Sequence, residues 1–448
     1  MSGRWRPTRA LGRALLVGLL LLAFGAVLGR GDLVVLGAPL VGAALWSVVT
    51  RPRRAPAVRG ALAEPLLREG EATTWRMDVD PVPGLRDVVA HLPGDRWART
   101  TPTHGHVAAA VADPALAVPV GVEVTVQRWG VRRLGPAQLA AFGDLGGFAW
   151  VRPEQETAGI AVLPSPGAFT SRAGLPHPVG LVGQHRSSRP GSGTELADVR
   201  PFRTGDRLRR VHWPVSLRTG SLHVTTTHGD EDAEVRVVVD ALRDLGSHEP
   251  DAGRRSSLDV AVEAAGAVAA HYLTTGDRVG LSVLGGAGLV EVPAVGGHHQ
   301  LARILLGLGR AEPARGTVGE DRRLRAQLRR PVAPGAVVVL LSALVSGEAL
   351  AHAVRLSRSG HVVLVVDTLP PGLTAPDLPA ADAVAATGID DPRLARLVWR
   401  LRLLDREREV RRCAAAGVPV LAWAGPGSLD AVLRGVGRRR RTPRVALR

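Results

Sequence analysis

The chain begins with two uncharged apolar runs, at residues 14–29 and 33–50. Only residues 30–32 separate the two runs. A helix needs about 20 apolar residues to cross the hydrocarbon core of a bilayer, within a range of about 17–25. The second run has this length, and the first reaches it when the four preceding residues are included and Arg13 extends to the interface. The pattern therefore predicts a membrane-spanning helical hairpin within residues 1–59.

Arginines flank both runs and set the expected orientation, because loops rich in arginine stay on the cytoplasmic side of a membrane. These residues are Arg4, Arg6, Arg9 and Arg13 before the first run and Arg51, Arg53, Arg54 and Arg59 after the second. We therefore expect a two-pass protein of the cell membrane, with its N-terminus and its C-terminal bulk in the cytoplasm. The alternative is a secretory signal peptide in the first run, whose removal leaves the second run as an anchor and places the bulk outside.

Residues 60–165 alternate between apolar and polar positions in short runs. In the clearest run, residues 120–129, Val122, Val124 and Val126 face one side while Glu123 and Thr125 face the other. This period of two predicts a half-buried strand. Further strands are expected at residues 73–79, 87–91 and 159–163. Because no helical run lies between them, we predict a β-rich, sandwich-like domain.

From residue 234 the chain alternates between nearly continuous apolar runs and helical ones. The predicted strands are residues 235–240, 278–284, 336–341, 361–367 and 418–423, and the predicted helices are residues 258–273, 299–308, 347–358 and 392–416. This alternation predicts a doubly wound α/β domain at residues 234–433, with a parallel sheet covered on both faces. Ligands of such sheets bind beyond the carboxyl ends of the strands, where Asp240, Ser342 and Asp367 are expected.

The composition removes several classes of function. The 448 residues carry a formal charge of +16, and all 57 basic residues are arginine. Without lysine the chain holds neither a Walker-type phosphate loop nor a Schiff-base nucleophile. The single cysteine, Cys413, leaves no internal disulfide to form.

The excess positive charge lies at the two ends of the chain. Residues 60–433 hold 41 arginines and 40 acids, so the body of the protein is nearly neutral. Since DNA-binding domains carry a basic face on their folded body, we expect no nucleic-acid partner. The basic tail, residues 434–448, is expected to lie against anionic lipid at the bilayer surface.

A junction segment, residues 166–233, is dense in arginine. It contains Glu195-Leu-Ala-Asp-Val-Arg-Pro-Phe-Arg-Thr-Gly-Asp-Arg-Leu-Arg-Arg-Val-His-Trp213 and then Ser216-Leu-Arg-Thr-Gly220. We expect a turn at residues 204–206, followed by the apolar anchors Leu208, Val211 and Trp213. Arginine forks pair with carboxylates, and arginine and tryptophan are enriched in interaction hot spots.

The junction segment is therefore either a salt-bridged internal strap or a surface for a partner. The candidate partner-binding residues are Arg200, Arg203, Gly205, Asp206, Arg209, His212, Trp213, Arg218 and Gly220.

This motif resembles that of domain-of-unknown-function family 58. The likeness rests on Glu-Leu-x-x-x-Arg-Pro-Phe-Arg-x-Gly-Asp, on the tryptophan that follows and on the later Arg-Thr-Gly. The segment Gly143-Asp-Leu-Gly-Gly-Phe148 is similar to a second stretch of that family, without its proline. The resemblance implies bacterial membrane-anchored proteins with two N-terminal spans, a β-rich segment and a von Willebrand factor A-like domain. It also implies a MoxR-type AAA+ ATPase, or the client of that ATPase, as the partner.

The α/β domain resembles von Willebrand factor A domains, in which three loops hold a divalent metal through Asp-x-Ser-x-Ser, a threonine and an aspartate. Here Asp240 keeps the first position but both serines of that loop are missing, and Asp244 and Ser342 complete a degenerate set. Arg243 stands among these residues. Magnesium requires several hard oxygen ligands, so we expect no metal and no other cofactor.

These observations predict a protein without catalytic activity: a membrane-anchored scaffold or adaptor that acts in protein assembly or cell-envelope processes. The alternative is a metal-dependent adhesion or binding module that faces outward. No residue is assigned a catalytic role.

Overall fold

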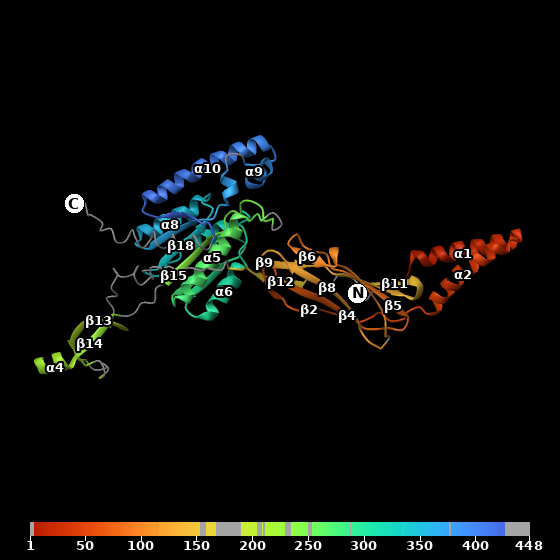
Figure 1. Ribbon diagram of the computed structural model, residues 1–448, viewed down its shortest axis with the longest axis horizontal. Coiled ribbons are helices and arrows are strands. Elements are labelled where there is room, and N and C mark those ends of the chain that lie inside the picture. Colours follow the sequence, from red (N-terminus) through yellow and green to blue (C-terminus); the bar gives the residue numbers. More distant parts are fainter. Residues whose placement is uncertain are drawn as a thin grey trace. The chain divides into compact units, whose positions relative to one another are not determined.

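The computed structural model divides into two compact units, Met1–Pro164 and Ser165–Arg448 (Figure 1). It describes residues 4–113, 115–152, 158–166, 190–203, 208, 211–228, 234–249, 253–286, 288–334, 336–375 and 378–425.

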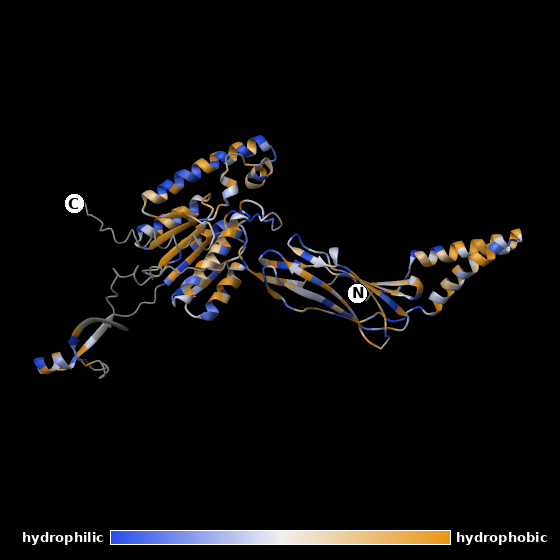
Figure 2. Cartoon of the chain, in the orientation of Figure 1, coloured by the Kyte–Doolittle hydropathy of each residue, from blue (hydrophilic) through white to orange (hydrophobic). Residues whose placement is uncertain are grey.

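The predicted helical hairpin is confirmed in the first unit by α1 (Arg9–Leu28) and α2 (Gly31–Val49). Both helices are long and apolar enough to cross a membrane, and Figure 2 shows apolar residues along most of each helix. Small residues let the helices approach closely, since a Cβ atom added at Gly37 would lie 2.9 Å from the carbonyl oxygen of Gly18. Gly29 ends α1 in the left-handed conformation, with φ 69°, which turns the chain directly into α2.

The rest of the first unit consists of three antiparallel or mixed sheets. Their strand orders are β1-β11-β10-β5-β7, β2-β4-β8-β6 and β3-β12-β9. The strands are β1 (Arg6–Pro7), β2 (Val58–Leu62), β3 (Leu66–Arg68), β4 (Ala72–Val79), β5 (Leu85–His91), β6 (Ala98–Thr101), β7 (His106–Ala110), β8 (Val118–Val126), β9 (Gly130–Leu134), β10 (Gln138–Gly143), β11 (Phe148–Arg152) and β12 (Ala158–Leu163).

Strand β8 shows why this part of the chain forms sheets. Val122, Val124 and Val126 are fully buried, whereas Glu123 is exposed, as the alternation predicts. The strand ends at Val126, three residues earlier than predicted. Buried residues of β4, β5, β8 and β10 belong to one hydrophobic core, so the sheets pack as a single sandwich-like body.

A loop between β10 and β11 fastens the helical hairpin to this body. Thr8, the N-cap of α1, donates its hydroxyl to the carbonyl of Gly146 at 2.7 Å and its amide to Gly147 at 3.0 Å. Ser47, near the end of α2, donates its hydroxyl to the carbonyl of Asp144 at 3.0 Å. A Cβ atom at Gly147 would lie 2.5 Å from that of Ser47, so only glycine fits there. We call residues 143–148 the hairpin latch.

The second unit contains a six-stranded sheet with the order β17-β16-β15-β18-β19-β20. Its strands are β15 (Glu234–Asp240), β16 (Arg278–Leu284), β17 (Val290–Val295), β18 (Val337–Ser342), β19 (Val362–Asp367) and β20 (Val420–Ala422). The helices are α5 (Ser257–Thr274), α6 (His298–Leu308), α7 (Val318–Leu328), α8 (Gly347–Arg358), α9 (Ala380–Thr387) and α10 (Pro392–Ala415).

Helices cover both faces of this sheet, as the alternation of strands and helices predicts. Helices α5 and α6 pack on one face, and α7, α8 and α10 share a core with Val238, Val338 and Leu340 on the other. The expectation of an all-parallel sheet is wrong at one edge, because β17 runs antiparallel to β16. Pro293 lies within β17, and proline is tolerated in an edge strand.

The junction segment forms a separate antiparallel pair, β13 (Pro190–Pro201) with β14 (His223–His228). The short helix α4 (Trp213–Thr219) lies between these strands in the sequence. Val211 is buried and bridges to Val224.

Candidate functional site

The carboxyl end of β15 meets that of β18 in the middle of the second unit's sheet. These two strands are parallel neighbours, and the connections leave them toward opposite ends of the strand order. In open α/β sheets ligands bind at such a switch point. Asp240 ends β15 and Ser342 ends β18, so the sequence prediction of their positions is confirmed.

The oxygens of Asp240 are already hydrogen-bonded within the chain. Oδ2 accepts the hydroxyls of Ser342 and Ser346, both at 2.6 Å, and Oδ1 accepts the amide of Leu242 at 3.0 Å. Burial raises the pKa of Asp240, because only 6% of this residue is exposed. The hydroxyl of Ser342 in turn accepts the amide of Leu344 at 3.0 Å. Asp240 thus fastens the loop after β18 to the end of β15.

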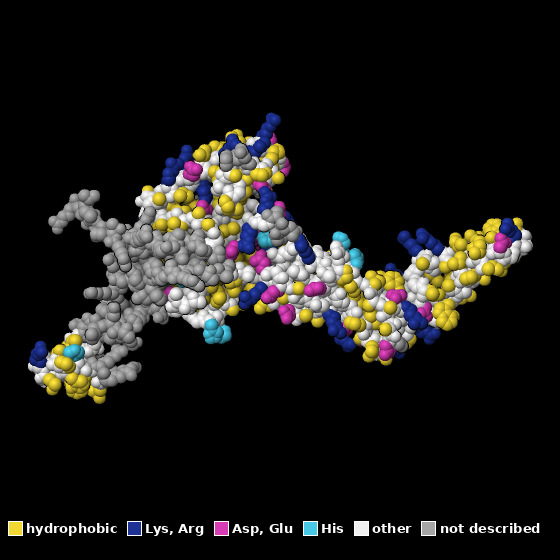
Figure 3. Space-filling view, viewed as in Figure 1, with side chains coloured by type: hydrophobic (Ala, Val, Ile, Leu, Met, Phe, Trp, Pro, Cys, Tyr) yellow, Lys and Arg dark blue, Asp and Glu magenta, His cyan; other side chains and the backbone are white. Residues whose placement is uncertain are grey.

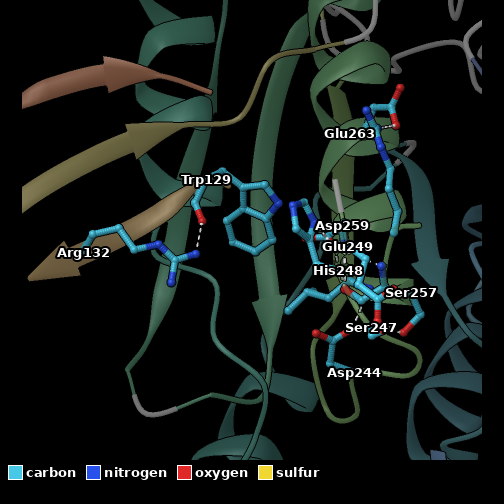
Figure 4. Close-up of polar contacts among 12 residues, drawn as sticks. Trp129, Arg132, Asp244, Ser247, His248, Glu249, Ser257, Asp259 and Glu263 are labelled. Carbon is cyan, nitrogen blue, oxygen red and sulfur yellow. Dashed lines mark hydrogen bonds and ion pairs between the residues drawn. The ribbon is translucent and has the colours of Figure 1, made fainter. Parts of the chain in front are cut away.

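Asp244 makes its hydrogen bonds at the start of α5 rather than at Asp240. Its Oδ1 accepts the amide of Leu258 at 3.0 Å in the first turn of α5 (Figure 4). A carboxylate at a helix N-terminus satisfies amides that have no partner within the helix. His248 also lies beside this turn, with its Nδ1 2.8 Å from Oδ2 of the buried Asp259. These contacts give Asp244 a capping function in α5.

A divalent metal does not fit the residues around Asp240. In the part of the chain that the structure describes, no group of three histidine, cysteine, aspartate or glutamate residues could hold a metal. The carboxylate of Asp240 already accepts three hydrogen bonds, and Asp244 is engaged at the start of α5. Asp367, at the end of β19, forms an ion pair with Arg406 of α10.

A pocket of about 470 Å³ opens beside these loops. It is lined by Arg243 from the loop after β15, by Leu344, Val345 and Gly347 after β18, and by the α10 residues Arg402, Asp405, Arg406, Arg408, Glu409 and Arg412. We call it the arginine pocket. The sequence pattern places Arg243 at this edge but not the arginines of α10, which follow Asp240 by more than 160 residues. Ser346 was missed as well, although its place directly before a predicted helix is typical of an N-cap.

The junction candidates that the structure describes lie on β13, directly after it, or in and beside α4. His212 is its N-cap, with Nδ1 accepting the amide of Val215 at 3.3 Å, and Gly220 ends it with φ 67°. Arg218 lies in its last turn and is exposed. Arg200 lies on β13 and donates to the carbonyl of Pro201 at 3.1 Å, and Arg203 follows two residues after β13.

The prediction of apolar anchors in the junction is wrong for two of the three residues. Val211 is buried, but Leu208 is 71% exposed and Trp213 is 61% exposed. Trp213 begins the short helix α4, and sequence periodicity over such a short segment cannot show that its side chain stays exposed. Gly205, Asp206 and Arg209 lie outside the described residues.

Comparisons with known proteins agree with the junction motif. Residues 198–393 match the family model described as "Protein of unknown function DUF58". Over 252 residues the chain is 29% identical to an uncharacterized protein of Mycobacterium tuberculosis. The aligned region covers 54% of this chain and 78% of that protein. An uncharacterized protein of Mycobacterium bovis gives the same values.

Among solved structures, a chitin binding domain from Burkholderia pseudomallei aligns with 22% of this chain and 56% of its own chain. The identity is 12% and the TM-score is 0.13, so this likeness carries no argument.

Proposed function

We propose that the protein is a membrane-anchored scaffold without catalytic activity, whose C-terminal unit binds a MoxR-type AAA+ ATPase or the client of that ATPase. The hairpin α1–α2 serves as the anchor, and both of its ends lie in the cytoplasm. The observation that carries this proposal is the internal use of Asp240. A carboxylate that holds two serine hydroxyls and a backbone amide acts as a structural tie, because three of its about four acceptor sites are used within the chain.

The sheet of the second unit supports a von Willebrand factor A-like fold. Numbered along the chain, its six strands have the order 3-2-1-4-5-6, and the third strand alone is antiparallel. An aspartate ends the first strand, as in that family. The remaining metal-binding positions have changed, so the domain is proposed to recognise proteins without a metal.

The exposed face of α4 supports the reading of the junction as a partner surface. Trp213 and Leu217 are 61% and 81% exposed, and Arg218 lies beside them in the sequence. Clustered apolar and arginine side chains that remain exposed are typical of protein-binding sites. Ion pairs that would favour an internal strap are absent from Arg218 in the described part of the chain.

The partner is tested with full-length protein in detergent and a purified MoxR-type AAA+ ATPase. We expect the immobilised chain to retain the ATPase, and Trp213→Ala with Arg218→Glu to reduce retention at least tenfold. The matched control is Leu289→Ala with Arg310→Glu, an exposed leucine and arginine elsewhere in the same unit, which should retain the ATPase fully. No retention by the wild type with ATP, ADP or no nucleotide contradicts the proposed partner, and equal retention by all three proteins places the interface outside α4.

The orientation is tested by cysteine labelling in intact cells. Cys413 is buried, and burial raises the pKa of its thiol, so it reacts poorly. A membrane-impermeant maleimide should label Asp32→Cys, in the first turn of α2, and should leave Glu69→Cys unlabelled until the cells are lysed. The reverse pattern places the bulk of the chain outside.

A further inference from the structure

The arginine pocket holds more positive charge than its own acids balance. Three of its arginines have acidic partners: Arg406 pairs with Asp367, Arg408 with Asp405 at 3.1 Å and Arg412 with Glu409 at 2.8 Å. Arg243, by contrast, makes no ion pair with any residue that the structure describes. Arg402 donates to the carbonyl of Ala386 at 3.3 Å and has no acidic partner within the same described residues.

The two remaining guanidinium groups, of Arg243 and Arg402, lie close enough to repel each other. Burial, together with the charge of Arg243, holds the pKa of Arg402 below its ordinary value. Like charges in one pocket are stabilised by an anion between them, and the forked donors of arginine fit a carboxylate.

The first turn of α8, which also holds Glu348, borders the pocket. Gly347, its first residue, lines the pocket, and the helix has no side-chain cap. The N-cap hydroxyl, on Ser346, instead donates to Asp240. The tie at Asp240 therefore leaves the amides of this helix end available to a ligand.

An apolar stripe runs along α10 and leads into the pocket. Leu394, Leu397, Leu401 and Leu404 follow a spacing of three and four residues and are each 48–57% exposed. In a helix, residues four apart lie in one row, so Leu401 precedes Asp405 and Leu404 precedes Arg408 in the pocket lining. Figure 3 shows hydrophobic and arginine side chains together over this helix.

We propose that the leucine stripe and the arginine pocket together bind an acidic amphipathic helix of a partner protein. The apolar side of that helix packs on the stripe, and one of its carboxylates lies between Arg243 and Arg402. This inference rests on the proposed scaffold function and states the chemistry of what the scaffold holds.

Charge and shape favour this occupant over others. Residues 392–415 carry eight arginines and three acids, so a second copy of α10 would bring like charges together. An anionic bilayer surface would cover the leucines and offer phosphates to the arginines, so it is kept as an outcome of the test below. A free anion fills the pocket but leaves the stripe uncovered.

The test uses the full-length chain in nanodiscs of phosphatidylcholine and a fluorescent synthetic helix with leucines every three and four residues and glutamates at one end. Fluorescence anisotropy should show saturable binding, and the same peptide with lysines in place of glutamates should bind at least tenfold more weakly. Arg243→Gln, Arg402→Gln and Leu401→Ser should each weaken binding at least tenfold. Arg303→Gln, an exposed arginine of α6 outside the pocket lining, is the matched control and should change binding less than twofold.

Several outcomes would overturn the proposal. Absent binding, or equal binding of the lysine peptide, removes the acidic helix as occupant. A dimer that Leu401→Ser dissociates identifies the stripe as a contact between copies, and sedimentation with phosphatidylglycerol vesicles that Leu401→Ser abolishes identifies a lipid surface. Pyrophosphate that binds wild type and Leu401→Ser equally, without peptide binding, identifies a free anion. None of these results depends on retention of the ATPase, so the two proposals fail separately.

Discussion

Lowering the pH should destabilise the second unit through one buried histidine. His352 lies on α8 and is only 7% exposed. Its Nδ1 lies 3.3 Å from Nη2 of Arg355, which donates to it when the ring is neutral. Burial and the charge of Arg355 lower the pKa of His352 from 6.5 to about 4. The unfolded chain therefore binds this proton at a higher pH than the folded chain does.

The size of the effect follows from this difference in pKa. A folded pKa below the unfolded value gives stability that is complete above pH 6.5 and is lost as the pH falls toward 4. The shift corresponds to about 3 kcal/mol in total, of which about 2 kcal/mol is lost at pH 5. For a domain of a few hundred residues, this lowers the melting temperature by roughly 4–8 °C.

The assay compares thermal unfolding of the wild type and of His352→Leu at pH 8, 6 and 5. The leucine variant does not titrate at this position, so its melting temperature should fall less with pH than that of the wild type. Asp240, whose pKa burial raises, contributes with the opposite sign. It is present in both proteins and cancels in the comparison. Parallel pH profiles of the two proteins would refute the reasoning.

Two further predictions concern the ties described above. Gly147→Ala should lower stability by about 1–3 kcal/mol, because the added Cβ overlaps Ser47, and Ser47→Gly should restore most of the loss in thermal unfolding. Ser346→Ala removes one of the two hydroxyl donors of Asp240 and should cost about 1–3 kcal/mol. Magnesium chloride should change the melting temperature of neither Ser346→Ala nor the wild type, and a saturable increase in either would show that a metal does bind.

The strands that could be predicted are those in which the order of apolar and polar residues follows directly from which side chains are buried. The continuous valines of β15 and the alternating valines of β8 carry that signal within a few residues. Strand β17 was missed because Pro293 interrupts it, and α7 was missed because its sequence, VGEDRRLRAQL, is polar on most sides. Whether such segments form a strand or a helix depends on the elements that pack beside them.

The residues of the candidate site also fall into those that the sequence pattern predicts and those that it does not. Asp240 and Ser342 were predicted together because parallel strands bring their carboxyl ends to one edge. Their partners were not, since Ser346 binds Asp240 through a loop geometry that spacing does not reveal. Arg402 reaches the pocket from α10, and no local pattern distinguishes it from the many exposed arginines of that helix.

The hairpin latch has a mechanical consequence. Because it holds the start of α1 through Thr8 and the end of α2 through Ser47, the two helices have no swivel at their base. A sideways load on the sheets is then passed to the helices, and if they cross a bilayer as proposed, the lipid resists their tilting. Under the proposed membrane anchoring, a force applied to the sheets would therefore be borne by the bilayer.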